Sequence, residues 1–347
     1  MSRTSKNSSK INAKLKGNLM PEYYCTGRLV TELVTLNEEK RKVKYLSPFA
    51  PPPSVSEHVT GLMLIGSALG YLIAENKKPI NRTFLLSCLL WHDAPEARYG
   101  DIGRDQRRYV SINEQKALAD AFGSVTWGTE VIDIIEQFEA GTTDIAVKAA
   151  KDADALYVIY TIKDLLQKGF VINDPDMRIQ KTLKRLSTEE AFNLGVEMSQ
   201  RDPREIKNLI RKYNRLQYKN DLLHSESVST VALISWALLE LRKLERKNGI
   251  DRGKVIETIL FNKLNSGKIG RVVNDANKIY KILATRRAKL QGKNVSLNFS
   301  GIFKSLKTVE GKKLAQILTE IDLYEWWNIL MGYGVIDNKG RFISKLR

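Results

Sequence analysis

The segment "LLWHDAPEARYGDI", residues 89–102, holds the residue types in this chain that are best suited to chemistry. His92 and Asp93 are adjacent at the end of an apolar run, and Glu96 and Asp101 follow closely. Imidazole nitrogens and carboxylate oxygens together suit Mn, Fe, Co, Ni or Zn, and Mg when water completes the shell. A metal site would explain why chargeable side chains end a segment that is expected to be buried, if other segments supply further ligands.

Two residues elsewhere in the chain have suitable types and positions. His58, one of three histidines, lies on a predicted helix over residues 55–73, and its spacing from the apolar positions of that helix points it inward. Asp154 lies in "AAKDADALYVIY" on a predicted long helix, where a carboxylate among alanines and aliphatic residues is costly to bury without compensation. A divalent cation would supply that compensation. Asp152, two residues earlier, competes with Asp154 for this role.

The elements that position these residues are helices, so the predicted fold class is all-α. A helical bundle is followed by a basic, mostly helical C-terminal domain that ends in a winged-helix-like hairpin, with strands at 335–336 and 341–343 around an Asn338-Lys339-Gly340 turn. We expect three parts: a basic disordered arm (1–20), the bundle that carries the site (21–200) and the accessory domain (201–347). Apolar periodicity predicts helices over 55–73, 84–93, 131–138, 145–166, 204–219, 228–244, 269–290 and 314–331.

The positive charge of the chain is concentrated outside the predicted bundle. The net charge is +17, yet residues 51–200 carry 16 basic and 21 acidic side chains, while residues 201–347 carry 30 basic and 14 acidic ones. This asymmetry predicts a carboxylate-rich site in the middle and polyanion contact, such as nucleic acid, through residues 201–347. Two cysteines exclude a disulfide framework. We expect no membrane span and no secretory signal, hence a cytoplasmic protein.

The order of these motifs resembles the HD-domain metal-dependent phosphohydrolase superfamily. "SEH" on one helix, "HDxxE" after an apolar run, "GD" just beyond and "ADAL" on a later long helix cover about residues 54–170. "SVSEH", "HDAPEARYGDI" and "KDADAL" look most like the bacterial and phage 5′-deoxynucleotidase branch. The resemblance implies one divalent metal ion (Mn, Co, Fe, Ni, Zn or Mg) held by His58, His92, Asp93 and Asp154. It also implies a nucleotide substrate and, as is common in this family, a homodimer.

The same resemblance assigns the catalytic acids and leaves the phosphate ligand open. Glu96 and Asp101 match the acidic pair that orients and activates the attacking water. Relatives usually have a proline-flanked basic residue after "GD", whereas "GRDQRRY" lacks those prolines, so the phosphate ligand stays open among Arg98, Arg104, Arg107 and Arg108.

The expected activity is metal-dependent hydrolysis of a (deoxy)nucleoside 5′-monophosphate. The alternatives are an HD-type nuclease, a dNTP triphosphohydrolase, and a nucleic-acid-binding protein with a sensor or vestigial HD site.

Overall fold

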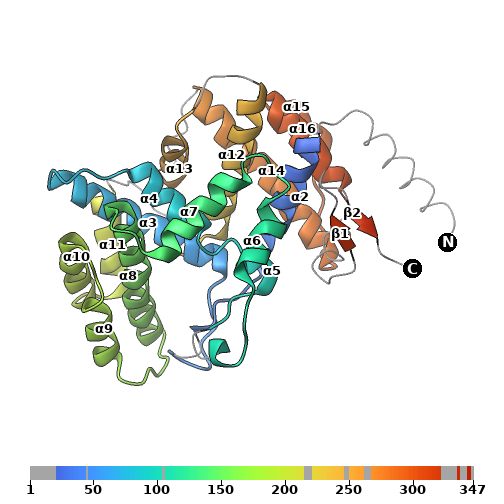
Figure 1. Ribbon diagram of the computed structural model, residues 1–347. Helices are drawn as coiled ribbons and strands as arrows, with labels where there is room; N and C mark the ends of the chain where they lie inside the picture. Colours follow the sequence, from blue (N-terminus) through green and yellow to red (C-terminus); the bar gives the residue numbers. More distant parts are fainter. Residues whose placement is uncertain are drawn as a thin grey trace.

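The described part of the protein is helical almost throughout, as the sequence predicted (Figure 1). The protein is seen here as a computed structural model, which describes residues 21–43, 46–103, 106–214, 221–245, 250–261, 267–321, 334–336 and 342–344. The predicted arm, residues 1–20, lies outside these ranges.

The helices follow one another with short connections. In chain order they are α2 (Pro21–Leu33), α3 (Val55–Glu75), α4 (Arg82–Trp91), α5 (Glu96–Tyr99), α6 (Glu114–Phe122), α7 (Gly128–Ala140), α8 (Ile145–Gln167), α9 (Pro175–Leu183), α10 (Glu189–Ser199), α11 (Pro203–Tyr213), α12 (Glu226–Glu245), α13 (Arg252–Leu260), α14 (Lys268–Leu290), α15 (Phe299–Ser305) and α16 (Val309–Glu320). Short 3-10 helices, η1 (Val34–Asn37) and η3 (Gln106–Arg108), stand between them.

The helices α3, α4 and α8 pack on one another at the centre of the bundle. Their close approach depends on two glycines of α3. A Cβ atom on Gly66 would overlap the side chain of Leu89 on α4, and one on Gly61 would overlap the ring of Tyr157 on α8. Because glycine leaves room for these side chains, α3 lies near enough to both partners for residues on the three helices to meet.

The helix α3 is the one described helix that is long and apolar enough, by length and composition alone, to cross a membrane, since an 18-residue window has a mean hydropathy of 1.3. Yet 78% of that window is buried inside the protein. An apolar helix of this kind is what the centre of a helical bundle requires, because neighbours cover it on most sides.

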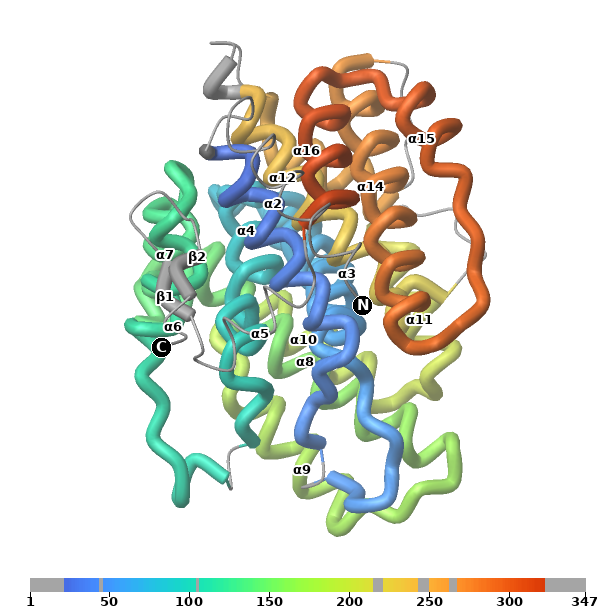
Figure 2. Tube along the Cα trace, turned by 90° about the vertical axis from the view of Figure 1, so that its right-hand side faces the viewer, coloured from blue at the N-terminus to red at the C-terminus, as the bar shows by residue number. Residues whose placement is uncertain are grey.

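The helices after residue 200 pack directly on those before it. Figure 2 shows α12 running beside α3 and α2, and α16 lies against α2. Side chains also bond across this boundary: Ser229 Oγ donates to the carbonyl of Ser56 at 2.9 Å, and Thr60 Oγ1 donates to the carbonyl of Ser225 at 2.7 Å. One hydrophobic cluster extends from Tyr23 to Ile321. The division predicted at residue 200 stays a prediction, and the two sides share a core.

The C-terminal predictions have mixed outcomes. The strands β1 (Gly334–Ile336) and β2 (Phe342–Ser344) pair antiparallel, with Val335 opposite Ile343, as predicted, while the predicted Asn338-Lys339-Gly340 turn lies outside the described residues. The described residues do not show a winged-helix module around it. The helix predicted over 314–331 ends earlier, since α16 ends at Glu320, and Trp326 and Trp327 lie outside the described residues.

Candidate metal centre

The first turn of α3 holds His58 in a fixed place. Ser54 is the N-cap: its hydroxyl accepts a hydrogen bond from the amide of Glu57 at 3.1 Å, and the Glu57 carboxylate accepts one from the amide of Ser54 at 2.6 Å. This capping box satisfies two amides that the helix itself leaves without partners. His58 follows directly, is 3% exposed, and its ring meets the edge of the Tyr157 ring at 4.8 Å between centroids.

The end of α4 holds His92 and Asp93. His92 is the C-cap, and its Nδ1 lies 3.0 Å from the carbonyl oxygen of Leu89. A carbonyl can only accept, so Nδ1 carries the proton and donates it, which leaves the lone pair on Nε2. Metal-binding histidines are oriented in this way, with the second nitrogen fixed by a hydrogen bond. Asp93 then projects from the turn that follows the helix.

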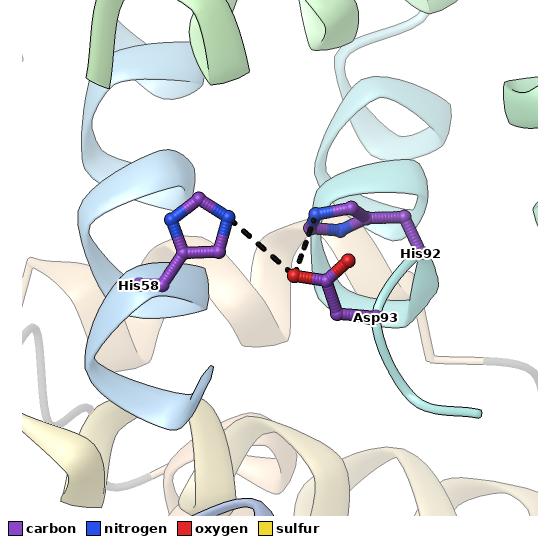
Figure 3. A group of neighbouring side chains, drawn as sticks. All are labelled: His58, His92 and Asp93. Atoms are coloured by element: carbon purple, nitrogen blue, oxygen red, sulfur yellow. Dashed lines mark ion pairs between the residues drawn. The ribbon is translucent and has the colours of Figure 1, made fainter. Parts of the chain in front are cut away.

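The three side chains converge on one carboxylate oxygen (Figure 3). Asp93 Oδ2 lies 3.4 Å from His58 Nε2 and 3.2 Å from His92 Nε2. One ligand atom from each residue lies within 4.8 Å of the other two. His58 Nε2 is buried and has no hydrogen-bond partner among the described residues. A buried nitrogen without a partner is costly, and a cation bound there would satisfy it, so this donor set fits a divalent metal.

The two aspartates of α8 face different surroundings. Asp154 Oδ1 lies 3.5 Å from His58 Nε2, beside the three converging ligands but outside their tight group. Asp152 is 1% exposed and accepts hydrogen bonds from the Ser187 and Thr188 amides at 2.8 Å each and from the Thr188 hydroxyl at 2.7 Å. Thr188 is the N-cap of α10. Of the two aspartates, Asp154 is therefore the one that lies beside the candidate ligand group, and Asp152 fixes the start of a helix.

This difference predicts opposite effects for two neighbouring substitutions. Asp154→Asn is expected to weaken metal binding at least about tenfold and to change the free energy of unfolding little, because its side chain is 43% exposed. Asp152→Asn is expected to leave the metal bound per folded molecule unchanged and to lower the free energy of unfolding by about 1.5–3 kcal/mol, since it weakens charge-assisted hydrogen bonds. Metal titration by calorimetry and urea unfolding of both variants measure this. Metal loss in the Asp152 variant alone would contradict the assignment.

Arg41 is a member of the site that the sequence analysis missed. Its guanidinium NH1 donates to Asp93 Oδ2 at 2.7 Å and lies 3.7 Å from Glu96 Oε1, and its Nε lies 3.6 Å from Asp101 Oδ2. One cation thus contacts three carboxylates. The available signal was the basic run Lys40-Arg41-Lys42 shortly before Pro51-Pro52-Pro53, which the predicted motifs did not include.

The neighbouring segment also fixes Asp101. The amide of Lys42 donates to Asp101 Oδ2, and the amide of Asp101 donates to Glu39 Oε1 at 3.1 Å. Asp101 follows Gly100, whose φ of 76° lies in the left-handed region that glycine favours. The chain can therefore turn sharply after α5 and bring Asp101 back toward Arg41. Asp101 is 6% exposed and Glu96, the first residue of α5, is 7% exposed.

The charges of the site change the pKa values of its members. Burial, with Arg41 next, holds the pKa of His58 well below its usual range, which favours the neutral imidazole that metals bind. Burial would also lower the pKa of His92, but the Asp93 carboxylate outweighs it and raises that pKa. Burial would raise the pKa of Asp93, but His92 and Arg41 lower it far below its usual range. Asp93 is thus an anion at neutral pH.

The pKa of Glu96 is shifted in the opposite direction to that of Asp93. Burial, followed by the negative charge of Asp93, raises the pKa of Glu96 well above its usual range. Its Oε2 is buried and has no hydrogen-bond partner among the described residues. A carboxyl group with a raised pKa binds a proton more tightly than an ordinary carboxylate does, which suits a general base or acid.

The predicted phosphate-binding arginines have different surroundings. Arg98 is turned to other partners: its Nε lies 2.6 Å from Glu32 Oε1, and NH2 donates to Glu32 Oε2 and to the Asp120 carbonyl, both at 2.9 Å. Arg98 and Arg108 do not line the cavity described below, whereas Arg107 does. Arg104 lies outside the described residues. Of the four, the part of the structure that is described thus supports Arg107 in this role.

The metal centre opens into a cavity of about 830 Å³. Small-molecule sites have volumes of roughly 300–1,000 Å³, so this one belongs to the upper part of that range. The cavity is lined by Arg41, Lys42, Val43, Leu46, His92, Asp93, Glu96, Asp101, Ile102, Gly103, Arg107, Phe138, Glu139, Lys151, Asp154, Ala155, Val158, Arg178, Lys181, Thr182 and Arg185.

Comparison with protein families identifies this part of the chain. Residues 34–194 match the model of the HD domain family, so this segment is an HD domain. The match lies within the predicted bundle, residues 21–200, and includes all four proposed ligands and both proposed catalytic acids. No curated protein matches the chain, and neither does any solved structure.

Proposed function

We propose that the protein is a metal-dependent phosphohydrolase that cleaves a phosphoester of a nucleotide, with a (deoxy)nucleoside 5′-monophosphate as its simplest substrate. The observation that carries this proposal is the convergence of His58 Nε2 and His92 Nε2 on Asp93 Oδ2, with Arg41 joining Asp93 to Glu96 and Asp101. The resemblance of "SVSEH" and "HDAPEARYGDI" to the 5′-deoxynucleotidase branch supports the choice of substrate.

In this proposal the four ligands bind the metal ion, and Glu96 transfers the proton. His58, His92, Asp93 and Asp154 would hold a divalent cation, which would lower the pKa of water and offset the negative charge of phosphate oxygens. Glu96 accepts the proton of the attacking water at its buried Oε2, and its raised pKa makes it a stronger base than an ordinary carboxylate. Asp101, held by the Lys42 amide, is placed to orient the substrate or to return a proton to the leaving alkoxide.

Arg41 is the phosphate ligand that the geometry favours. Burial alone would lower its pKa, but Asp93, followed by Glu96 and Asp101, raises it, so the guanidinium stays charged. It lies at the centre of the cluster, and its planar group of donors suits the oxygens of a phosphate. Arg107, further along the same cavity, is exposed and lies 3.7 Å from Glu114. It is the second member of this proposed clamp.

The first experiment measures phosphate release. Purified protein is incubated with the deoxynucleoside monophosphates and the dNTPs in the presence of Mn²⁺, Co²⁺, Mg²⁺ or a chelator. We expect inorganic phosphate from the monophosphates with metal, and none with the chelator. Triphosphate release from dNTPs would select the triphosphohydrolase instead. No turnover of any nucleotide with any of the metals would contradict the proposal.

A second candidate function is nucleic-acid binding through residues 201–347. Besides the charge of this region, the observation that favours it is a separate cavity of about 250 Å³ whose lining includes Arg242, Arg271 and Lys307. Basic side chains grouped around a hollow suit phosphate oxygens. This candidate predicts that polyanion binding depends on Arg242 and Arg271 and is insensitive to metal.

A further inference from the structure

The cavity at the metal centre continues onto a basic face of α9. Arg178, Lys181 and Arg185 are spaced by three and four residues, so they share one side of the helix and its C-terminal extension, and all three line the cavity. Lys151, one turn before Asp154 on α8, lines it as well. The carboxylates at the metal centre thus share one cavity with a row of cations.

The positive charges of Lys181 and Arg185 are not neutralised by acidic side chains among the described residues. Lys181 and Arg185 are exposed, and neither forms an ion pair with any residue that the structure describes. Arg178 is half-buried, and its Nε donates to the carbonyl of Asn173 at 2.8 Å, which steadies the side chain without neutralising it. Like charges held side by side repel one another, and a bound polyanion would remove that repulsion.

Two strongly exposed aromatic residues lie close along the chain to residues that line the cavity. Phe49 is 89% exposed and lies three residues after Leu46, while Tyr109 is 87% exposed and lies two residues after Arg107. Leu46 and Arg107 both line the cavity. Aromatic side chains beside a basic groove form the combination that binds single-stranded nucleic acid, because every base can stack on a ring while the phosphates contact the cations.

We propose that the cavity and the basic face of α9 together form a groove that binds a short single-stranded oligonucleotide. Its terminal phosphate lies at the metal centre, the next phosphates lie along Lys181 and Arg185, and its bases stack on Tyr109 and Phe49. The inference rests on the proposed phosphohydrolase activity and extends the substrate from a mononucleotide to the end of a nucleic-acid strand. A mononucleotide has one phosphate and one base, so it would leave the α9 cations and at least one aromatic ring without a partner.

The test measures the binding of a fluorescein-labelled, 5′-phosphorylated hexathymidylate by fluorescence anisotropy. The protein carries Glu96→Gln, which is expected to slow hydrolysis of the probe while the metal stays bound. Lys181→Glu/Arg185→Glu is expected to weaken binding by about tenfold or more at low salt and to lower the slope of log Kd against log salt by about 1.4, or roughly 0.7 for each phosphate contact. Tyr109→Ala is expected to weaken binding about fivefold or more through lost stacking.

The matched control is Lys148→Glu/Lys184→Glu. It makes the same change in net charge on α8 and at the end of α9, and these exposed lysines do not line the cavity. We expect binding within about twofold of the parent, because only long-range electrostatics change. Equal losses in both double variants would overturn the inference, and so would unchanged binding in the α9 variant. Competition by dTTP as strong as by unlabelled hexamer would also overturn it, in favour of a nucleoside triphosphate.

The two proposals can fail separately. Phosphate release from monophosphates by the parent protein, combined with oligonucleotide binding that ignores α9, overturns the groove assignment alone. Oligonucleotide binding that depends on α9, without turnover of any nucleotide or strand by the parent protein, supports the groove assignment and overturns the proposed activity.

Discussion

An Asp93→Asn variant is expected to lose phosphate release by about 10³-fold or more, together with its bound metal. Asp93 Oδ2 is the atom on which both imidazole nitrogens converge, so the substitution replaces the shared anionic ligand by a neutral amide of the same size. Divalent cations bind a neutral amide far more weakly than a carboxylate when the remaining ligands are imidazoles and one partly exposed aspartate. Phosphate release and metal content per folded molecule are the two measurements.

Asp133→Asn is the matched control, since Asp133 is an exposed aspartate on α7 and lies outside the cavity. It should keep both metal and activity. The Asp93 variant is also expected to be less stable without metal. The lowered pKa of Asp93 stabilises the fold above the ordinary carboxyl pKa of 3.8, and this contribution is lost as pH falls through the lowered value. Circular dichroism must therefore show a folded variant. A folded variant with full activity would contradict the ligand assignment.

Glu96→Gln is expected to reduce kcat by about 10²–10⁴-fold while the metal stays bound. The glutamine keeps the shape of the side chain but cannot accept the proton of the attacking water at Oε2. Glu96 is not one of the converging ligands, so metal affinity should change by less than about threefold. Steady-state kinetics with metal titration separates this outcome from a ligand defect. A variant with unchanged kcat would remove Glu96 from the mechanism.

Glu96→Gln is also expected to stabilise the metal-free protein, whereas Asp93→Asn is expected to destabilise it. The pKa of Glu96 is raised in the folded protein, so the contribution of this group to stability decreases as pH rises from the unfolded pKa of 4.5 through the raised value. Ionisation of this buried carboxyl group opposes folding, and glutamine, which does not ionise, removes that penalty. Metal-free Glu96→Gln should therefore melt higher than the parent by about 2–4 °C for each kcal/mol gained. A lower melting temperature would show that the contact with Arg41 outweighs burial.

The sequence predicted the central helices well because their apolar patterns are strong. The helix expected over 55–73 is α3, and that over 145–166 is α8, each within two residues of the predicted ends. The shorter helices α9, α10 and α13 were not predicted. Their apolar positions are few, and they are stabilised by tertiary contacts, such as the hydrogen bonds that Thr188 at the start of α10 donates to Asp152.

The candidate site was predictable where adjacent motifs encode it and not where distant segments supply it. His58, His92 and Asp93 meet as the motifs indicated, and the two neighbouring aspartates on α8 are distinguished by the partners of Asp152. Arg41 belongs to no motif, and only the fold brings it to Asp93. The basic face of α9 was likewise not predicted as part of the site, because only the fold shows that it lines the cavity.

Because α12 packs on α3, the candidate metal site depends on a helix that is synthesised after all of its proposed ligands. The backbone of Ser56, two residues before His58, is bonded by Ser229, and the hydroxyl of Thr60 is bonded to Ser225. A nascent chain that has reached residue 200 already contains every proposed ligand, yet the apolar face of α3 that α12 covers is still open to water. We therefore expect the candidate metal centre to reach its final shape only after α12 has left the ribosome, and a truncation at residue 200 to aggregate rather than to fold alone.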